Sequence, residues 1–140
     1  ELAQVRIDTR LDVNASGLRT PAEVESLIAR MDVIVTTRLH GLVMAIKNDR
    51  PVVAVDPIAG GAKVHRQAKT IGWPVVFKAD EISDTELGKA FDYCLSDEAR
   101  ARARECHRFA KSALSGIHDQ FISALTAGKD SRGYRRSWQE

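Results

Sequence analysis

The chain has little of what small secreted domains and membrane proteins rely on for stability. Only two of its 140 residues are cysteines, Cys94 and Cys106. Two cysteines cannot build a disulfide framework and lack the paired spacing of a zinc site, so we expect both to be small core residues. The longest apolar run is only a few residues, far short of the roughly 18 to 20 that span a bilayer. We therefore expect a cytoplasmic chain without a transmembrane segment, and a peripheral place at the inner membrane face stays open.

A strong net charge of either sign is also missing, because 21 Lys and Arg face 19 Asp and Glu for a net charge of +2. The last twelve residues account for that charge, with Lys129, Arg132, Arg135 and Arg136 against Asp130 and Glu140. The body before them is therefore neutral. Because nucleic-acid-binding domains usually spread positive charge over one face, we expect no nucleic-acid partner.

What the chain does have is the composition of a globular domain, with 44% hydrophobic and 29% charged residues. Apolar periodicity predicts short strands alternating with helices. The expected strands cover residues 5–11, 33–35, 52–55 and 74–77, and the expected helices cover 21–31, 38–48, 62–71, 84–95 and 97–127. This order predicts an α/β fold: a parallel Rossmann-like sheet of about four strands, helices on both faces and a long C-terminal helix.

Four strands are few for a doubly wound sheet, and the sequence opens almost at once on a strand-like stretch. We therefore expect the chain to be part of a longer protein. Residues 1–128 would form one Rossmann-like domain, and residues 129–140 would form a basic C-terminal tail.

Chemistry-bearing residues follow two of the buried strands, where open α/β sheets bind their ligands. Arg38, His40 and Gly41 come directly after the strand at 33–35. A guanidinium offers paired donors to phosphate or carboxylate, an imidazole can move a proton, and glycine permits close backbone approach. After the next strand, Gly60 and Gly61 precede Lys63, whose ammonium is a point charge for an anion.

Each candidate also has a purely structural interpretation. Arg38 is equally suited to pair with Asp32 or Asp56, and His40 to cap or pack against a helix. Two adjacent glycines most often mark a turn. Lys63 is followed by His65, Arg66 and Lys69, which together are more typical of a solvated helix face than of a ligand cluster.

The segment from Met31 to Ile46, which contains Arg38-Leu39-His40-Gly41, is followed by Pro51-Val52-Val53-Ala54-Val55 and then by Lys63. This arrangement resembles the carboxyl-terminal domain of the polysaccharide pyruvyl transferase family over about residues 20 to 75. The resemblance implies a GT-B-like two-domain fold with phosphoenolpyruvate (PEP) as donor. The acceptor would be a pair of sugar hydroxyls on an exopolysaccharide, a cell-wall glycan or a lipid-linked sugar.

The resemblance also implies roles for individual residues. Arg38 would clamp the donor's anionic groups, and His40 would act as general acid or phosphate partner. Lys63 would be a secondary anion contact, with Gly41, Gly60 and Gly61 at the donor site. A base for the acceptor would lie on a missing N-terminal domain, so we expect this chain alone to be inactive. We expect neither a metal nor a cofactor.

Two alternatives remain open from the sequence. One is a nucleotide-sugar-dependent glycosyltransferase domain of the same GT-B architecture. The other is a non-catalytic interaction module whose basic tail recruits a partner or an anionic surface.

Overall fold

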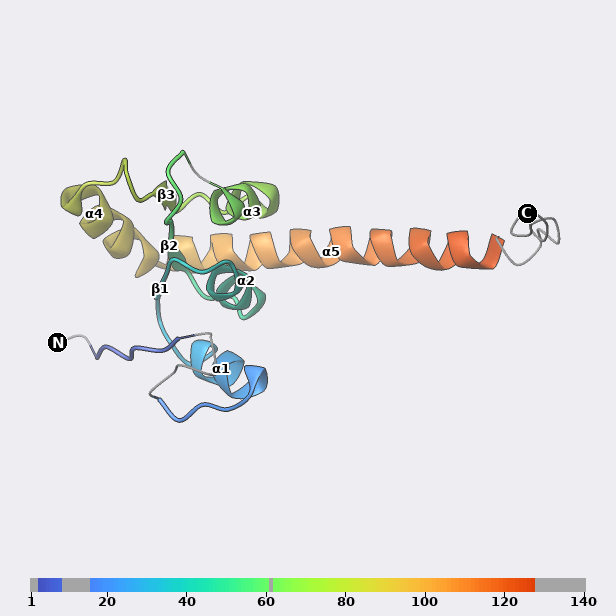
Figure 1. Cartoon of the computed structure of the whole chain (residues 1–140), viewed down its shortest axis with the longest axis horizontal. Coiled ribbons are helices and arrows are strands. Elements are labelled where there is room, and N and C mark those ends of the chain that lie inside the picture. Colours follow the sequence, from blue (N-terminus) through green and yellow to red (C-terminus); the bar gives the residue numbers. More distant parts are fainter. Residues whose placement is uncertain (1–2, 9–15, 61, 128–140) are drawn as a thin grey trace, which may run out of the picture. The chain divides into compact units, whose positions relative to one another are not determined.

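A computed structural model describes residues 3–8, 16–60 and 62–127 of the chain (Figure 1). The chain divides into two compact units, Glu1–His107 and Arg108–Glu140. The elements run in the order α1 (Pro21–Ile28), β1 (Ile34–Thr36), α2 (Leu39–Lys47), β2 (Val52–Asp56), α3 (Lys63–Ile71), β3 (Val76–Lys78), α4 (Asp84–Cys94) and α5 (Asp97–Ala127).

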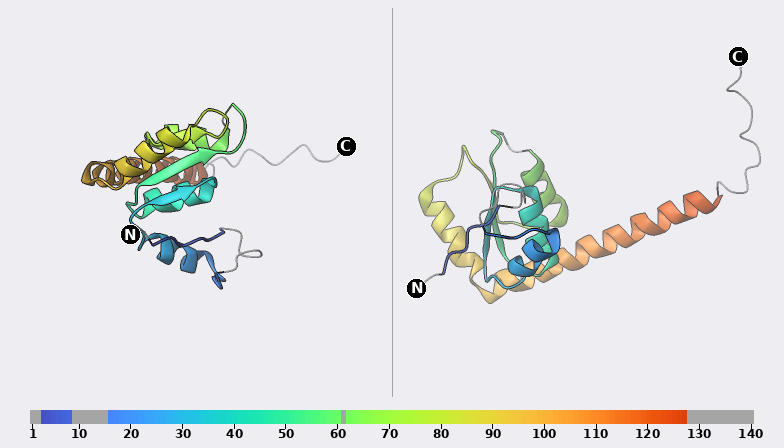
Figure 2. Two further views of the ribbon diagram at one scale, coloured as in Figure 1. Left: turned by 90° about the vertical axis from the view of Figure 1, so that its left-hand side faces the viewer. Right: turned by 60° about the horizontal axis from the view of Figure 1, so that its bottom comes forward.

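The first unit is built on a parallel sheet in the order β1-β2-β3, with β1 and β2 side by side in Figure 2. Val52, Val53 and Ala54 of the central strand are completely buried. The predicted α/β class with a parallel sheet and a long C-terminal helix is therefore confirmed. The GT-B-like assignment stays a prediction.

The expected fourth strand is not found within the described part of the chain. Residues 5–8 form no strand, and 9–11 lie outside the described residues. An alternating apolar pattern gives a strand only where another strand's edge pairs with it. Here β1 has only three residues, and its Val35 side chain remains 59% exposed. The local pattern was therefore insufficient to predict pairing.

Helices cover both faces of the sheet, as the alternation of elements predicts. Figure 1 shows α2 and α3 on one side of the strands and α4 on the other. Trp73, which lies shortly before β3 in the chain, is buried and donates its indole N–H to the Val52 carbonyl oxygen at 2.7 Å. Burial of a large aromatic ring with its one polar group satisfied stabilises the central part of the sheet.

Local signals explain where several helices begin and end. A capping box formed by Thr20 and Glu23 starts α1, with Pro21 in its first turn, as the sequence predicts. The helix ends at Ile28 rather than at Met31. The amides of Arg30 and Met31 bond to carbonyls three residues back, so the last turn tightens out of α-helical geometry.

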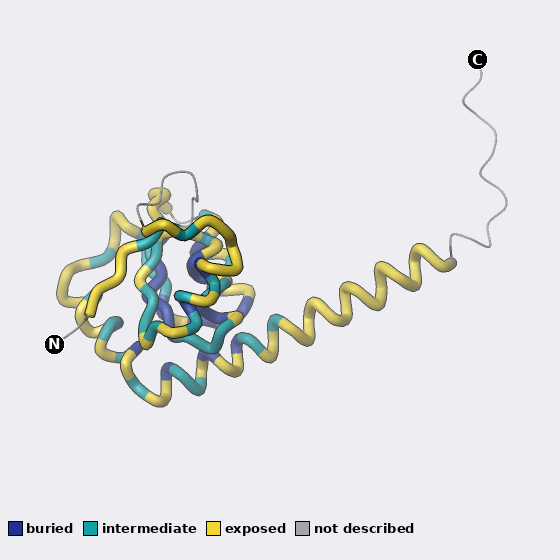
Figure 3. Tube along the Cα trace, turned by 90° about the horizontal axis from the view of Figure 1, so that it is seen from below, coloured by how far each residue is buried: buried dark blue, intermediate teal, exposed yellow. Residues whose placement is uncertain are grey.

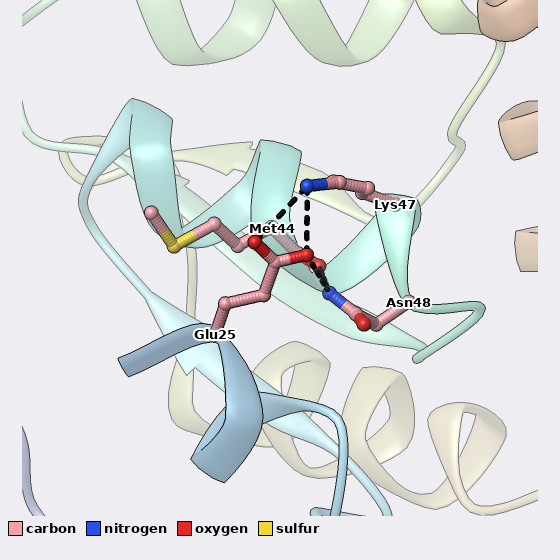
Figure 4. A network of polar contacts seen from close by, with 4 residues as sticks. All are labelled: Glu25, Met44, Lys47 and Asn48. Atoms are coloured by element: carbon pink, nitrogen blue, oxygen red, sulfur yellow. Dashed lines mark hydrogen bonds and ion pairs between the residues drawn. The ribbon is translucent and has the colours of Figure 1, made fainter. Parts of the chain in front are cut away.

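A polar network joins α1 to α2 (Figure 4). The Glu25 carboxylate lies 2.8 Å from the Lys47 ammonium and accepts a 3.2 Å hydrogen bond from the Asn48 side-chain amide. The same amide donates to the Met44 carbonyl at 2.8 Å, which satisfies a carbonyl in the last turn of α2. Hydrogen bonds from Lys47 and Asn48 hold the pKa of Glu25 below its usual value.

The first three turns of α5 belong to the first unit and pack through Ala99, Ala103 and Cys106, all buried. Three polar contacts fasten these turns to the segment before each strand: Arg100 to Asp32 at 3.2 Å, His107 to Asp49 at 2.8 Å and Arg102 to the Gly72 carbonyl at 2.9 Å. The start of α5 therefore lies at the amino ends of the strands.

Both cysteines are buried and free, as predicted. Burial raises the pKa of the Cys94 thiol to about 12. Burial also raises the pKa of Cys106. Because the thiolate is the reactive form of cysteine, neither side chain is suited to nucleophilic chemistry near neutral pH.

Candidate functional site

A cavity of about 310 Å³ lies at the opposite end of the sheet, where β1 and β2 finish. Its lining comes from both loops that the sequence singles out: Thr37, Arg38, Leu39, Asp56, Pro57, Ile58, Lys63 and Val64. The structure therefore brings Arg38 and Lys63 to one cavity. Its volume is at the lower end of the roughly 300 to 1,000 Å³ typical of small-molecule sites.

The other predicted site residues do not line this cavity. His40 is exposed in the first turn of α2, two residues beyond Arg38. Gly60 is exposed and has a φ of +78°, which fits the turn interpretation of the glycine pair. Gly61 lies outside the described residues.

Arg38 is held at the cavity by the turn between β1 and α2. The Thr36 hydroxyl accepts the Arg38 amide at 3.0 Å, which places Arg38 at the N-cap of α2. Among the described residues, no side chain caps this helix. The free amides of a helix's first turn carry a partial positive charge, so the Arg38 guanidinium lies beside a second source of attraction for anions.

The partner of Arg38 is neither Asp32 nor Asp56, the two carboxylates considered from the sequence. Its guanidinium lies 3.6 Å from the Asp8 carboxylate, and the two side chains are 51% and 35% exposed. Asp32 pairs instead with Arg100. An exposed pair of this kind contributes about 0 to 1 kcal/mol, so an anionic ligand can compete for the guanidinium.

Asp56 is the buried charge of the site, with 1% of its surface exposed. Its carboxylate accepts backbone N–H groups from Ala62 at 2.6 Å, His65 at 3.0 Å and Ile58 at 3.2 Å. Burial favours the neutral acid, but these amides outweigh it and hold the pKa of Asp56 below its usual value of 3.8. One carboxylate therefore organises the whole loop between β2 and α3.

This role of Asp56 was not predicted from the sequence. The N-cap residue of α3 is Ala62, which has no side-chain acceptor, so the start of this helix depends on an acceptor from elsewhere. An acidic residue at the end of a buried strand, six positions ahead of an uncapped helix, is the signal that identifies it. The Asp56 carboxylate already accepts hydrogen bonds from amides at the start of α3. An anion in the cavity can therefore contact the side chain of Lys63 but cannot bind those amides.

Gly41 has a packing role in the structure. It is buried, and a Cβ built on it would meet the Thr36 hydroxyl and lie 3.0 Å from the Thr36 Cβ. The absence of a side chain lets α2 approach β1 closely, which sets the position of the helix start that carries Arg38.

Within the described residues, no group of three or more His, Cys, Asp or Glu side chains is placed to hold a metal ion. In the same part of the chain, no helix combines the length and apolar character required to cross a membrane.

The fold and the cavity define the class of protein: a parallel α/β domain whose candidate ligand site lies at the carboxyl ends of its strands. The family model described as Polysaccharide pyruvyl transferase matches residues 5–57. This segment includes β1, α2 and β2 and ends inside the cavity lining. No curated protein and no solved structure matches the chain.

The match confirms the resemblance predicted from the Arg38-Leu39-His40-Gly41 motif, which lies within the matched segment. The similarity to this family covers residues 5–57 and does not favour the glycosyltransferase alternative. Asp8, Arg38 and Asp56 fall inside the match, whereas Lys63 lies beyond it.

Proposed function

We propose that the chain is the donor-binding part of a PEP-dependent pyruvyl transferase. The observation that carries the proposal is the position of Arg38. It belongs to the segment matched by the transferase family and lines one cavity together with Lys63. The acceptor would be a glycan or lipid-linked sugar, and its base would come from a second, N-terminal domain.

The donor's chemistry fits the groups at this cavity. PEP carries a phosphate and a carboxylate on a three-carbon frame, so it needs several cationic or N–H donors in a small space. A guanidinium binds either group through two parallel hydrogen bonds, and an ammonium adds a point charge. In our proposal Arg38 binds one anionic group with help from the first amides of α2, and Lys63 binds the other.

Ketal formation from PEP requires three changes. The methylene carbon gains a proton and becomes a methyl group, two sugar oxygens bond to the neighbouring carbon and lose their protons, and the C–O bond to phosphate breaks. Groups that stabilise the departing phosphate lower the barrier most, because negative charge develops there. We assign this role to Arg38. The role of His40 as proton donor or phosphate partner stays a prediction, because His40 does not line the cavity. No metal or cofactor is needed for these steps.

Replacing Arg38 with Ala tests the proposal directly. A lost charge-assisted hydrogen bond costs about 1.5 to 3 kcal/mol, so PEP affinity should fall by roughly 10- to 100-fold. The affinity of the 140-residue chain for PEP is measured by NMR titration, with pyruvate and inorganic phosphate as comparison ligands. Arg30→Ala is the control, since Arg30 is exposed and lies outside the cavity. Equal PEP binding by wild type and Arg38→Ala would refute the proposal.

Asp8→Asn should have the opposite effect. It removes the carboxylate that now pairs with Arg38, so PEP binding should strengthen by up to about fivefold, the equivalent of about 1 kcal/mol for an exposed pair. The same titration measures the change. Asp32→Asn is the matched control, because Asp32 pairs with Arg100 rather than with Arg38. Weaker binding by Asp8→Asn would mean that Asp8 serves the ligand instead of competing with it.

A further inference from the structure

The second unit carries an exposed apolar surface that the donor site does not use. Every residue of α5 from 111 to 126 is exposed (Figure 3). Five large apolar side chains in this segment have 45% to 67% of their surface exposed: Leu114, Ile117, Phe121, Ile122 and Leu125. A helix segment surrounded by water gains little stability from packing, and Gly116 lowers its intrinsic stability further. Such a segment has the character of one half of an interface.

The apolar residues of this segment follow the spacing of a helix pair. Five of them succeed one another at alternating intervals of four and three residues: Ala110, Leu114, Ile117, Phe121 and Ala124. This heptad spacing lines the seam along which two helices pack. We call these five residues the α5 seam. At about 100° per residue, Leu125 lies directly beside the seam, whereas Ile122 lies farther round the helix.

The order of large and small residues makes the seam complementary to itself. In an antiparallel pair of α5 helices, Ile117 of each copy can lie opposite Phe121 of the other. The same register then places Leu114 of each copy opposite Ala124 of the other. Large side chains meet small ones at the outer positions, which allows close packing along the seam. A parallel pair would instead place leucine on leucine and alanine on alanine.

Charge also favours the antiparallel arrangement. Lys111 and His118 lie on one flank of the seam, and a parallel pair would place each beside its own copy. In the antiparallel register Lys111 lies beside the last turn of the other helix, which contains no base and ends in carbonyls of partial negative charge. The two Lys111 residues are then about 24 Å apart along the axis, well beyond a screening length of about 8 Å.

The polar face of the segment argues against a membrane surface as the occupant of the seam. This face carries Ser112, Ser115, Asp119 and Ser123. Helices that lie in a membrane surface usually carry Lys and Arg on their polar face. A second protein helix needs no such charges, because the seam itself supplies the contact.

We propose that the α5 seam joins two copies of the chain as an antiparallel helix pair. Leu114, Ile117, Phe121 and Leu125 are each more than half exposed. Side chains of this size leave roughly 500 Å² of apolar surface per copy, so the pair would bury about 1,000 Å² in total. Because that area is at the lower limit of specific interfaces, we expect a micromolar dissociation constant. This inference is independent of the proposed PEP site.

Sedimentation equilibrium tests the inference with the full 140-residue chain. Wild type should show a monomer–dimer equilibrium between micromolar and millimolar concentration. Ile117→Ser/Phe121→Ser should raise the dissociation constant by at least about tenfold, because the two central apolar side chains leave the interface. Ser112→Gln/Ser123→Gln is the matched control: it changes two exposed residues on the opposite side of the same helix and should dimerise like wild type.

Engineered cysteines test the direction of the pair. Under mild oxidation Leu114→Cys/Ala124→Cys should form a covalent dimer, whereas Leu114→Cys alone should not. Within one helix these two positions are about 15 Å apart, too far for an intramolecular disulfide. The natural Cys94 and Cys106 are buried, and wild type treated in the same way controls for them. A covalent dimer of Leu114→Cys alone would overturn the antiparallel arrangement.

The inference fails if wild type stays monomeric up to millimolar concentration. It fails equally if Ile117→Ser/Phe121→Ser dimerises as tightly as wild type. Flotation with vesicles of phosphatidylcholine and phosphatidylglycerol provides a further readout. A monomeric wild type that floats, and that no longer floats after Ile117→Ser/Phe121→Ser, would overturn the inference and assign the seam to a lipid surface.

Discussion

Replacing Asp56 with Ala should destabilise the first unit by about 3 kcal/mol, because several buried backbone N–H groups would lose their acceptor at once. The amides of Ile58, Ala62 and His65 all bond to this carboxylate. The free energy of unfolding is measured by urea denaturation at neutral pH. Asp92→Ala is the control: Asp92 is exposed on α4, and its replacement should change the unfolding free energy by less than about 0.5 kcal/mol.

The pH dependence of this difference identifies its cause. The pKa of Asp56 in the folded chain lies below its usual value of 3.8, so the unfolded chain binds the proton more readily. A lowered pKa stabilises the folded chain at pH values above the unfolded pKa. That stability is lost as pH falls through the lower, folded value. The gap between wild type and Asp56→Ala should therefore be full at neutral pH and shrink below about pH 4. A gap independent of pH would show that shape rather than charge matters at this position.

Asp56→Asn separates the support of the loop from the charge of the site. The new side-chain amide keeps one oxygen that can accept backbone N–H groups, so Asp56→Asn should be less destabilising than Asp56→Ala. It also removes a negative charge from the cavity that Arg38 and Lys63 line. Measuring PEP affinity and unfolding in the same variant then shows whether Asp56 positions the loop or opposes the donor's charge.

Local sequence signals predicted the elements that carry the site. The apolar run at 33–35, the helix stripe after it and the next apolar run correspond to β1, α2 and β2, with boundaries that differ by at most one residue. The helix predicted at 97–127 matches α5 in full. These predictions succeeded because each depends on the periodicity of neighbouring residues, which the chain encodes locally.

The contacts that complete the site could not be predicted in the same way. Arg38 pairs with Asp8 rather than with Asp32, which is nearer in the sequence. Asp56 bonds to amides up to nine residues ahead. Such pairs depend on how separate elements pack, and the sequence offers more than one suitable carboxylate for each cation. The prediction of about four strands was wrong for the same reason, because strand pairing depends on two segments rather than on one.

The contacts of α5 at the amino ends of the strands show this limit most clearly. Nothing in the spacing of Arg100, Arg102 and His107 distinguishes them from a solvated helix face. In the structure they contact the segments before β1, β3 and β2 respectively. Only the buried Ala99, Ala103 and Cys106 leave a sequence signal, because small apolar residues at helical spacing allow close packing.

Gly41→Ala should be strongly destabilising, by about 2 to 3 kcal/mol, although alanine is normally the better helix former. The added methyl group would collide with the Thr36 side chain, so α2 must move away from β1. Gly88→Ala is the matched control. Gly88 also lies inside a helix, but nothing is within 4 Å of its Cβ position, so alanine there should stabilise the unit by about 0.5 to 1 kcal/mol.

The partner of Gly41 makes this prediction specific. Adding Thr36→Ala to Gly41→Ala removes the hydroxyl and methyl groups in the collision, so the double variant should recover more than about 1 kcal/mol relative to additivity. It should not recover PEP affinity fully, because the Thr36 hydroxyl also accepts the Arg38 amide that starts α2. If Gly41→Ala proved as stable as Gly88→Ala, close packing of α2 on β1 would not be what positions Arg38.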